Sequence, residues 1–234
     1  MQMHDTYILK IDRNIEKDDF DRLFHCVSEE KKERINRYHR FEDAQRALLG
    51  DILARYAICK RVGIRNRDLA FETNAYGKPL LRELTGIHFN ISHSGNWVIC
   101  AIDDNAVGVD VEMIKPIDLE IAERFFSRDE YRYLMNQPEE MKLKCFYMFW
   151  TLKESYIKTE GKGLSIPLNS FTIKLENNDI KLAIGDEIRE FYFYQSFPDP
   201  DTVYAICTLN RNAGERIHWN MENFLKEAQN DCFI

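Results

Sequence analysis

The sequence predicts an α+β protein made of two halves, because helical patterns give way to strand patterns twice along the chain. Apolar residues recur at helical spacing over residues 42–61, and short strand-like runs follow up to residue 103. A second long helix is predicted over residues 139–160, and further strand-like runs follow up to residue 209. The break between the halves falls near Asn105. A chain of 234 residues is long enough for two such units with a real core.

In the first half, local signals mark where elements begin and end. Ser28 followed by two glutamates predicts a helix start, with a capping hydroxyl and acidic residues beside the N-terminal dipole. Gly63 ends the long helix, since glycine readily adopts the left-handed C-cap conformation. The composition of residues 74–79 predicts a turn. Strands are predicted over residues 7–11, 88–91 and 97–103.

The second half begins with a predicted strand over residues 107–112 and a helix over residues 117–125. Ser127 caps a further short helix before the long one. Residues 177–179 suit a hairpin turn, and residues 211–234 are expected to form a tail with a short helix near 221–225. The later strands are predicted over residues 171–175, 180–184, 188–195 and 203–209.

Composition narrows the class of protein. The net charge of −7 argues against a protein that coats nucleic acid by bulk charge. No apolar run is long enough to span a membrane, and residues 1–10 lack the features of a secretory signal, so we expect a cytoplasmic protein. The cysteines form no C-x-x-C pair, and we expect reduced, buried thiols rather than disulfides or a zinc site.

Asp110 and Glu112 lie two residues apart on a predicted strand, which places both carboxylates on one face. Neighbouring carboxylates repel each other, and a hard cation such as Mg²⁺ would relieve that repulsion. As an isolated pair, however, such a pattern is more often the ordinary polar face of a half-exposed strand.

Trp150, Glu154 and Lys158 share one side of the second long helix. A carboxylate and an ammonium beside a metal site suit phosphoryl chemistry, in which the cation offsets phosphate charge. Taken alone, Glu154 and Lys158 would more often be a surface ion pair of little energetic value.

Donor-rich segments in the first half point to the same chemistry. The stretch from Ser92 through His93 to Gly95 suits a phosphate-binding turn, although a lone histidine is more often structural. Lysines and arginines over residues 31–37, together with Lys78, add positive charge, and a solvated helix face is the plainer interpretation of that run. Combined with the acidic groups, they supply what a phosphorylated ligand needs.

These motifs fall into separated blocks that resemble the Sfp-type 4′-phosphopantetheinyl transferases, specifically the broad-specificity type that serves peptide synthetases. The likeness covers the chain up to about Leu209 and keeps the family's order of blocks. The blocks are residues 40–51 (RFEDAQRALLGD), 76–79 (YGKP), 89–95 (FNISHSG), 107–112 (VGVDVE), 149–158 (FWTLKESYIK) and 161–165 (GKGLS).

The resemblance implies an α/β (α+β) fold in which two similar α/β halves have a pseudo-twofold arrangement, with coenzyme A and the active site between them. The expected division is an N-terminal half over 1–104 with coenzyme A contacts, a C-terminal half over 105–210 with the metal and carrier-docking sites, and a C-terminal tail over 211–234.

The resemblance also implies the site residues. The family's Mg²⁺ ligands fall on Asp110, Glu112 and Glu154. The family's catalytic residues fall on Glu154, Lys158 and His93, with Lys158 on the pyrophosphate. Coenzyme A contacts fall on Lys31, Arg34, Lys78, Ser92, His93 and Lys158.

Two positions depart from the family's pattern. Arg34 stands where close relatives have lysine, which keeps the charge and changes its geometry. Ala47 replaces a hydroxyl residue that helps to hold the 3′-phosphate, which puts that one contact in doubt.

The implied reaction moves 4′-phosphopantetheine from coenzyme A to a serine of an apo peptidyl or acyl carrier domain. The serine attacks the β-phosphate, 3′,5′-ADP leaves, and Glu154 accepts the serine proton directly or through water. The carrier is expected to dock on residues 113–119 and 161–168. The resemblance further implies a monomer and a role in nonribosomal peptide or antibiotic production.

Two other functions remain open at this point. One is a non-catalytic module that binds coenzyme A or a carrier protein, although such a module has no need to keep repelling carboxylates together. The other is a different magnesium-dependent phosphate enzyme, such as a phosphatase or nuclease; the acidic net charge argues against a nuclease.

Overall fold

The computed structural model describes residues 4–176 and 179–231, and it shows helices followed by strands twice. The first half contains β1 (His4–Lys10), α1 (Lys17–Phe24), α2 (Glu29–Asn36), α3 (Phe41–Val62), η1 (Asn66–Asp68), β2 (Phe71–Thr73), β3 (Pro79–Leu81), β4 (His88–Ser94) and β5 (Trp97–Asp103). The second contains β6 (Val107–Met113), α4 (Ile121–Phe125), α5 (Arg128–Met135), α6 (Glu139–Glu160), η2 (Gly163–Ser165), η3 (Leu168–Ser170), β7 (Thr172–Glu176), β8 (Asp179–Ile184), β9 (Glu187–Arg189), β10 (Tyr192–Asp199) and β11 (Thr202–Thr208). The chain then continues into β12 (Ala213–Asn220) and α7 (Met221–Asp231).

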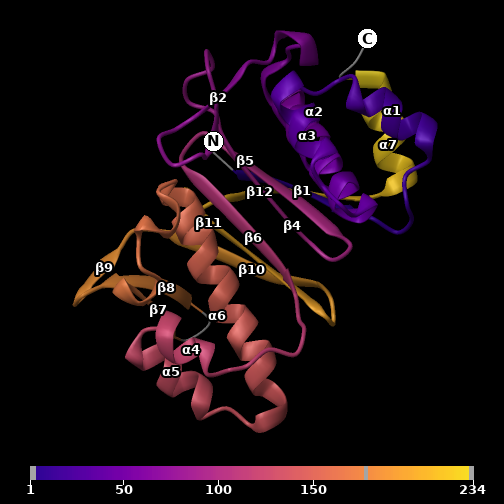
Figure 1. Ribbon diagram of the computed structural model, residues 1–234. Helices are drawn as coiled ribbons and strands as arrows, with labels where there is room; N and C mark the ends of the chain where they lie inside the picture. The colour runs from indigo at the N-terminus through magenta and orange to yellow at the C-terminus, as the bar shows by residue number, and fades with distance from the viewer. Residues whose placement is uncertain (1–3, 177–178, 232–234) are drawn as a thin grey trace.

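The two halves repeat one topology. In the first half, β1 pairs antiparallel with β5, and β5 pairs antiparallel with β4. In the second half, β6 pairs antiparallel with β11, and β11 pairs antiparallel with β10. Three α-helices lie between β1 and β4 in the chain, and three lie between β6 and β10. The third helix of each set, α3 or α6, is 22 residues long. Figure 1 shows α1, α2 and α3 on one side of the central strands and α4, α5 and α6 on the other. The expected pseudo-twofold arrangement of two similar α/β halves is thereby confirmed.

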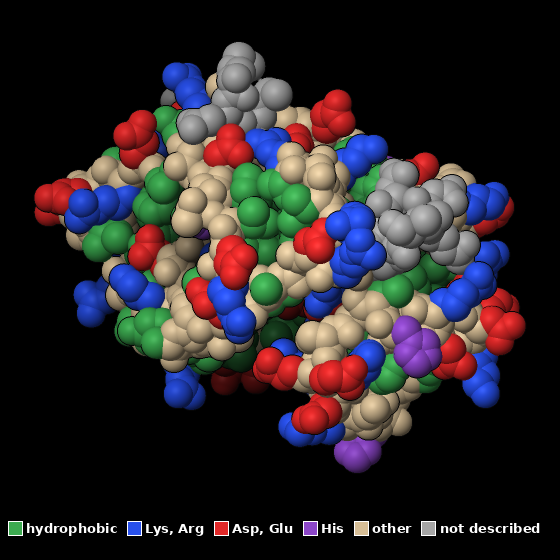
Figure 2. Space-filling model, turned by 90° about the horizontal axis from the view of Figure 1, so that it is seen from above, with side chains coloured by type: hydrophobic (Ala, Val, Ile, Leu, Met, Phe, Trp, Pro, Cys, Tyr) green, Lys and Arg blue, Asp and Glu red, His purple; other side chains and the backbone are tan. Residues whose placement is uncertain are grey.

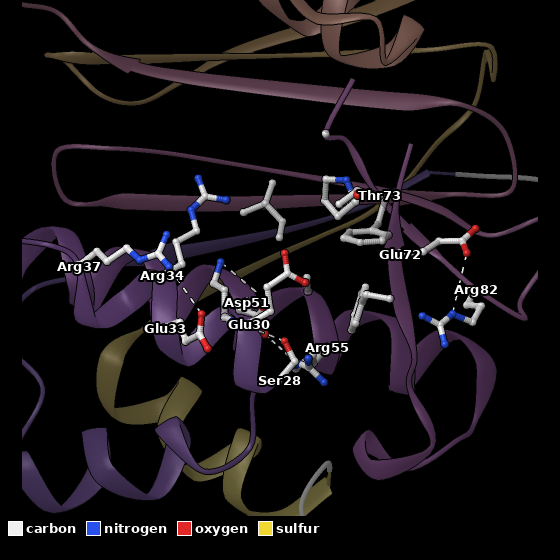
Figure 3. A pocket seen from close by; sticks show the side chains of 17 residues that line it. Ser28, Glu30, Glu33, Arg34, Arg37, Asp51, Arg55, Glu72, Thr73 and Arg82 are labelled. Carbon is white, nitrogen blue, oxygen red and sulfur yellow. Dashed lines mark hydrogen bonds and ion pairs between the residues drawn. The ribbon is translucent and has the colours of Figure 1, made fainter. Parts of the chain in front are cut away.

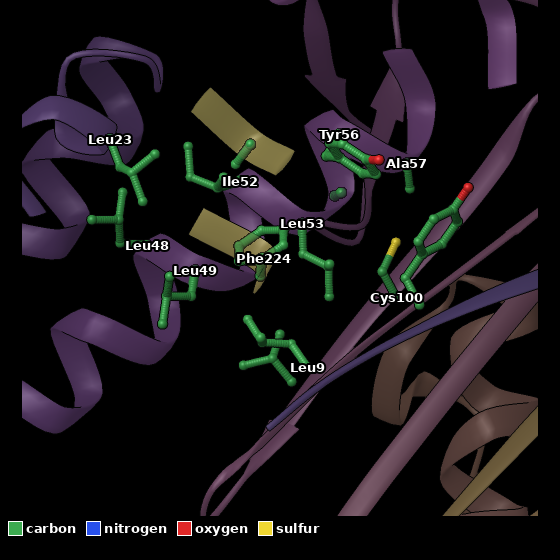
Figure 4. Packing of buried hydrophobic residues seen from close by; sticks show 14 of the residues in the cluster. Leu9, Leu23, Leu48, Leu49, Ile52, Leu53, Tyr56, Ala57, Cys100 and Phe224 are labelled. Atoms are coloured by element: carbon green, nitrogen blue, oxygen red, sulfur yellow. The ribbon is translucent and has the colours of Figure 1, made fainter. Parts of the chain in front are cut away.

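Each half has its own apolar core, and a third core joins them. In the first half, Leu48, Leu49 and Ile52 of α3 pack over the sheet and against Phe224 of α7 (Figure 4). In the second, α6 packs on β6 and β11. The third core lies between the two sheets and contains Ile8, Trp97, Ile99, Ala101, Val107, Val109, Val111, Tyr204 and Ile206.

The expectation of a separate tail over 211–234 is wrong for the described residues. β12 pairs in parallel with β1 and thereby extends the sheet of the first half. Trp219 packs against Tyr7 and Tyr56, and the helix predicted near 221–225 runs over all of Met221–Asp231. The aromatic residues of this segment bury apolar area on the first half, which stabilises its position there.

Other boundaries differ from prediction for local reasons. The strand predicted over 188–195 is two strands, because β9 pairs with β8 before the chain crosses to the other sheet as β10. The helix predicted over 117–125 is limited to Ile121–Phe125. In the expected hairpin turn, residues 177 and 178 lie outside the described residues, although β7 and β8 on either side do pair antiparallel.

Cysteine and membrane expectations can also be compared with the structure. Cys100, Cys145 and Cys207 are buried free thiols, and Cys26 is a free thiol of intermediate burial. Cys59 is buried in α3. Cys232 lies outside the described residues. Over residues 4–176 and 179–231, no helix has the length and apolarity that crossing a membrane would require.

Candidate functional site

β6 presents Asp110 and Glu112 on one face, as their spacing predicts. Val109 and Val111 point the other way, into the core between the two sheets. Asp110 is buried and Glu112 is half-buried. The strand therefore holds both carboxylates on the face opposite the core between the sheets, with Asp110 shielded from bulk water and Glu112 partly so.

Serines of β4 fix the orientation of these carboxylates. The hydroxyl of Ser92 donates to Oδ1 of Asp110 at 3.1 Å and accepts from the backbone N–H of Val111 at 3.2 Å. One step along, Ser94 donates to Oε2 of Glu112 at 3.0 Å and accepts from the N–H of Met113 at 3.1 Å. The two halves are thus joined at the site by serine hydroxyls of β4, each of which hydrogen-bonds to the backbone and to an acidic side chain of β6.

Asn90 continues the same row, because its Oδ1 accepts from the N–H of Val109 at 2.9 Å. The sequence motifs assigned no role to Asn90 and placed Ser94 only within a donor-rich, phosphate-binding turn. Their signal was the alternation Asn-x-Ser-x-Ser, which places all three polar side chains on one face of a strand.

α6 brings Lys158 to the same point. Its Nζ lies 2.6 Å from Oδ1 of Asp110 and donates also to the Ser92 hydroxyl and the Val109 carbonyl, both at 3.1 Å. Gly108 permits this approach, since a Cβ there would lie 2.1 Å from the carbonyl oxygen of Ser155 in α6. Only glycine lets the helix lie so close to the strand.

Glu154 lies one turn before Lys158 and completes the acidic group. Burial raises its pKa, as does the negative charge of Asp110, while Lys158 lowers it in part. Burial likewise raises the pKa of Glu112 to about 7, with further contributions from Asp110 and Glu154. Burial raises the pKa of Asp110 despite the opposing effect of Lys158. The three carboxylates lie close enough to disfavour one another's charge.

This donor set fits a hard divalent cation. Oδ2 of Asp110 is buried and has no hydrogen-bond partner among the described residues, so one acidic oxygen is left for another ligand. Carboxylate oxygens are the ligands that Mg²⁺ prefers, usually with retained waters. Within the described ranges, no three His, Cys, Asp or Glu side chains are arranged so that together they could hold a metal ion. The fit therefore rests on the unpartnered oxygen and the mutual repulsion of the acids.

A cavity of about 610 Å³ lies in the first half, between α2, α3 and the β2–β3 hairpin. Figure 3 shows Arg34 and Arg37 at one end and the Glu72–Arg82 ion pair at the other. Phe71 and Phe89 supply an apolar wall. The cavity suits a ligand with both anionic and flat apolar parts.

The two predicted cations of this cavity have different surroundings. Lys31 is partly buried, with Nζ 3.8 Å from Oδ1 of Asp51, and burial lowers its pKa although Asp51 opposes the shift. Arg34 is exposed and makes no ion pair with any other described residue. Ala47, where the family has a hydroxyl, is buried in α3.

His93 lies at the end of β4, between Ser92 and Ser94 in the chain. Loss of solvent around the ring lowers its pKa, and the positive charges of Arg46, Lys158 and Lys31 lower it further. The histidine is thus surrounded by cations from both halves, in an electrostatic setting suited to phosphate.

Lys78 does not line the 610 Å³ cavity, although its neighbours Gly77 and Pro79 do. Its ammonium group points between the halves and donates to backbone carbonyls of β6 and α6. It also borders a smaller, mostly apolar cavity of about 280 Å³, together with Tyr76, Leu164 and the site residues Glu154 and Lys158.

The outer surface carries charges of both signs. On the face seen in Figure 2, Lys and Arg side chains alternate with Asp and Glu over most of the visible area. The basic character of the site thus comes from particular side chains rather than from a uniformly positive surface.

Family models match both halves of the chain. "4′-phosphopantetheinyl transferase, N-terminal" matches residues 14–105, and "4′-phosphopantetheinyl transferase superfamily" matches residues 106–208. A solved structure of Thermotoga maritima holo-[acyl-carrier-protein] synthase matches partially, with a TM-score of 0.38 and 21% identity over 46% of this chain and 64% of that chain.

Curated proteins of similar sequence carry the same description. The 4′-phosphopantetheinyl transferase Sfp of Bacillus subtilis is 41% identical over 90% of this chain and 95% of its own length. The 4′-phosphopantetheinyl transferase psf-1 of Bacillus pumilus is 41% identical over 94% of both chains. The 4′-phosphopantetheinyl transferase gsp of Aneurinibacillus migulanus is 39% identical over 86% of this chain and 80% of its own length.

Proposed function

The chain belongs to the 4′-phosphopantetheinyl transferase family, and from this premise we propose how its own residues carry out the transfer. The enzyme moves 4′-phosphopantetheine from coenzyme A to a serine of an apo carrier protein and releases 3′,5′-ADP. Nothing in the comparisons favours a non-catalytic binding module or a different phosphate enzyme. The proposals below concern the metal, the residue roles, the carrier surface and the setting.

The 610 Å³ cavity is the proposed site for the nucleotide end of coenzyme A. Lys31 and Arg34 would bind the 3′-phosphate, and Arg34 brings an exposed guanidinium that can bind two phosphate oxygens at once. Phe71 and Phe89 offer an apolar wall for the adenine. Ser92 contacts Asp110, and Ser92 and His93 at the end of β4 would bind the pyrophosphate.

Asp110, Glu112 and Glu154 are the proposed ligands of Mg²⁺. When bound, this ion offsets the negative charge of the pyrophosphate and acts as a Lewis acid. The unpartnered Oδ2 of Asp110 and the raised pKa values of Glu112 and Glu154 support the assignment, because uncompensated buried carboxylates are costly.

Lys158 stabilises the leaving group in this mechanism. Its ammonium reaches the site between the carboxylate of Asp110 and the hydroxyl of Ser92 and would neutralise charge on the departing 3′,5′-ADP. Glu154 accepts the proton of the carrier serine. The raised pKa of Glu154 suits a general base, because a base works best when its pKa is nearer to the pH at which it acts.

The carrier domain is proposed to dock beside the acidic group, on residues 113–119 and 161–168. Ile117 is 38% exposed and Leu164 is 76% exposed, so both segments present an apolar side chain to solvent. A role with peptide synthetases, a cytoplasmic location and a monomeric state complete the proposal.

The observation that carries the mechanism is the contact of Lys158 with Asp110 inside a group of three carboxylates. It is tested by mixing the protein, coenzyme A and Mg²⁺ with an apo peptidyl carrier domain and weighing the carrier by mass spectrometry. We expect the mass to rise by one phosphopantetheine, and not with a carrier whose serine is alanine or when EDTA is present. An unmodified carrier with folded protein, tested with peptidyl and acyl carriers, would contradict the proposal.

A further inference from the structure

We propose that Asn74 and Lys78 are positioning residues that hold the C-terminal end of α6, and so place Glu154 and Lys158, rather than ligands of coenzyme A. This inference rests on the proposed function of Glu154 and Lys158. The two residues belong to the turn between β2 and β3, in the first half, whereas α6 belongs to the second. We call the two side chains and their acceptors the clasp.

The ammonium of Lys78 is fully used by backbone acceptors. Its Nζ donates to the carbonyls of Lys158 at 2.5 Å, Val107 at 3.1 Å and Thr159 at 3.4 Å. An ammonium has three donors, and here three carbonyls accept. Lys158 and Thr159 lie in the last turn of α6, where backbone carbonyls find no N–H donor within the helix. A cation at this end also interacts favourably with the helix dipole.

Asn74 adds a second hold on the same helix end. Its Nδ2 donates to the carbonyl of Gly161 at 2.7 Å. Its Oδ1 accepts from the N–H groups of Tyr76 and Lys78, both at 2.9 Å, so the same side chain also shapes the turn. One asparagine therefore fixes both the turn that carries Lys78 and the helix end that Lys78 contacts.

The helix end is shaped to receive these side chains. Gly161 has φ of 67°, a left-handed conformation that favours glycine. A Cβ at this position would lie 2.9 Å from Cδ of Lys78 and 3.3 Å from Nδ2 of Asn74. Glycine is thus required both by the backbone and by the closeness of the clasp.

The environment of Lys78 favours a structural role for its charge. Within the described residues its hydrogen bonds go to main-chain oxygens, and burial lowers its pKa to about 8. To reach a phosphate, the ammonium would have to leave the three carbonyl oxygens that accept from it. Lys158, by contrast, lies on the carboxylate of Asp110, and its own backbone carbonyl is held by Lys78.

The test compares Lys78→Met and Asn74→Ala with Lys31→Met, which makes the same lysine substitution in the nucleotide cavity. We expect kcat to fall about tenfold or more in Lys78→Met and Asn74→Ala, while the Kd of 3′,5′-ADP by calorimetry changes less than about threefold. In Lys31→Met the Kd of 3′,5′-ADP should rise about tenfold. The two clasp substitutions should be non-additive in kcat when combined, because both act on one helix end.

A second measurement does not depend on turnover. Hydrogen exchange of peptides covering residues 155–165 should be faster in Lys78→Met and in Asn74→Ala than in the unmodified protein, and unchanged in Lys31→Met. Asn74→Ala removes a side chain from a turn and keeps the test open if Lys78→Met does not fold.

Three results would overturn the clasp. The first is a Kd of 3′,5′-ADP that rises as much in Lys78→Met as in Lys31→Met, while the kcat of Lys78→Met is unchanged. The second is a normal kcat in Asn74→Ala. The third is unchanged hydrogen exchange at the end of α6 in both clasp variants. Failure of the proposed function gives a different result. If the unmodified protein had no transferase activity, hydrogen exchange at the end of α6 would still be faster in the clasp variants than in the unmodified protein.

Discussion

Nζ of Lys158 lies 2.6 Å from Oδ1 of Asp110, while Oδ2 of the same buried carboxylate has no hydrogen-bond partner among the described residues. One oxygen thus faces the fixed positive charge from α6, and the other is left for a further ligand. The second half supplies both partners of this ion pair, and Ser92 from the first half bonds to both. The site is therefore complete only where the two halves meet.

Lys158→Ala should lower kcat by about two orders of magnitude, corresponding to a loss of about 2–4 kcal/mol of transition-state stabilisation. The reason is that the departing 3′,5′-ADP loses a fixed positive charge. Turnover of coenzyme A with an apo carrier domain measures this. Lys142→Ala is the matched control, since Lys142 lies on the same helix but pairs with Glu139 away from the site. Equal rates for Lys158→Ala and the control would exclude the assigned role.

Glu154→Gln should cut kcat strongly while the fold persists, because the amide can neither accept the serine proton nor supply a negative charge to a cation. Circular dichroism checks the fold, and turnover checks the activity. Near-normal turnover would remove Glu154 from both proposed roles.

The metal-free protein should become less stable as pH rises from about 4.5 to about 7 through the contribution of Glu112. Its pKa is raised from 4.5 to about 7, so over this window the folded state keeps a proton that the unfolded state has released. Glu112→Gln should therefore stabilise the protein in EDTA at pH 8, by at most about 3 kcal/mol.

Urea unfolding of both proteins at pH 5 and pH 8 measures this difference. Mg²⁺ should stabilise the unmodified protein more than Glu112→Gln, because a bound cation relieves the same repulsion. If Glu112→Gln is no more stable than the unmodified protein at pH 8 in EDTA, the carboxylate is not the strained group that its environment indicates.

Ser94→Ala should weaken divalent-cation binding about tenfold, because residues that orient metal ligands typically contribute this much. Its hydroxyl donates to Glu112 at 3.0 Å. Titration with Mn²⁺ followed by electron paramagnetic resonance measures the affinity. Ser165→Ala is the control, since that hydroxyl donates only to the carbonyl of Lys162. Unaltered Mn²⁺ affinity in Ser94→Ala would show that Glu112 needs no such support.

Lys153→Met should destabilise the protein by about 3–5 kcal/mol, because it leaves the carboxylate of Glu130 buried without its cation. Both side chains are 0% exposed, and Nζ of Lys153 lies 2.7 Å from both carboxylate oxygens. Adding Glu130→Gln should restore much of the loss, as the remaining group is then neutral. Urea unfolding measures both; a double variant as unstable as the single one would contradict this account.

Local rules were sufficient for the two long helices and for the shared face of Asp110 and Glu112. The direction of side chains repeats every few residues in a helix or strand, so the apolar pattern of neighbouring positions predicts which face is buried. The family blocks added the metal, coenzyme A and carrier assignments, which remain proposals at the level of single residues. The resemblance itself was sufficient for the family.

Only the tertiary structure decided which of these residues meet. Ser92 and Asp110 are 18 residues apart, Glu130 and Lys153 are 23, and Lys78 and Lys158 are 80. β12 joins β1 from the opposite end of the chain, and this long-range pairing is absent from the local patterns that predict a tail over residues 211–234. Lys78 was assigned to coenzyme A by its motif, yet its ammonium lies on the end of α6. Such contacts depend on how helices and sheets pack across the whole chain, and that packing is not encoded in the spacing of any one segment.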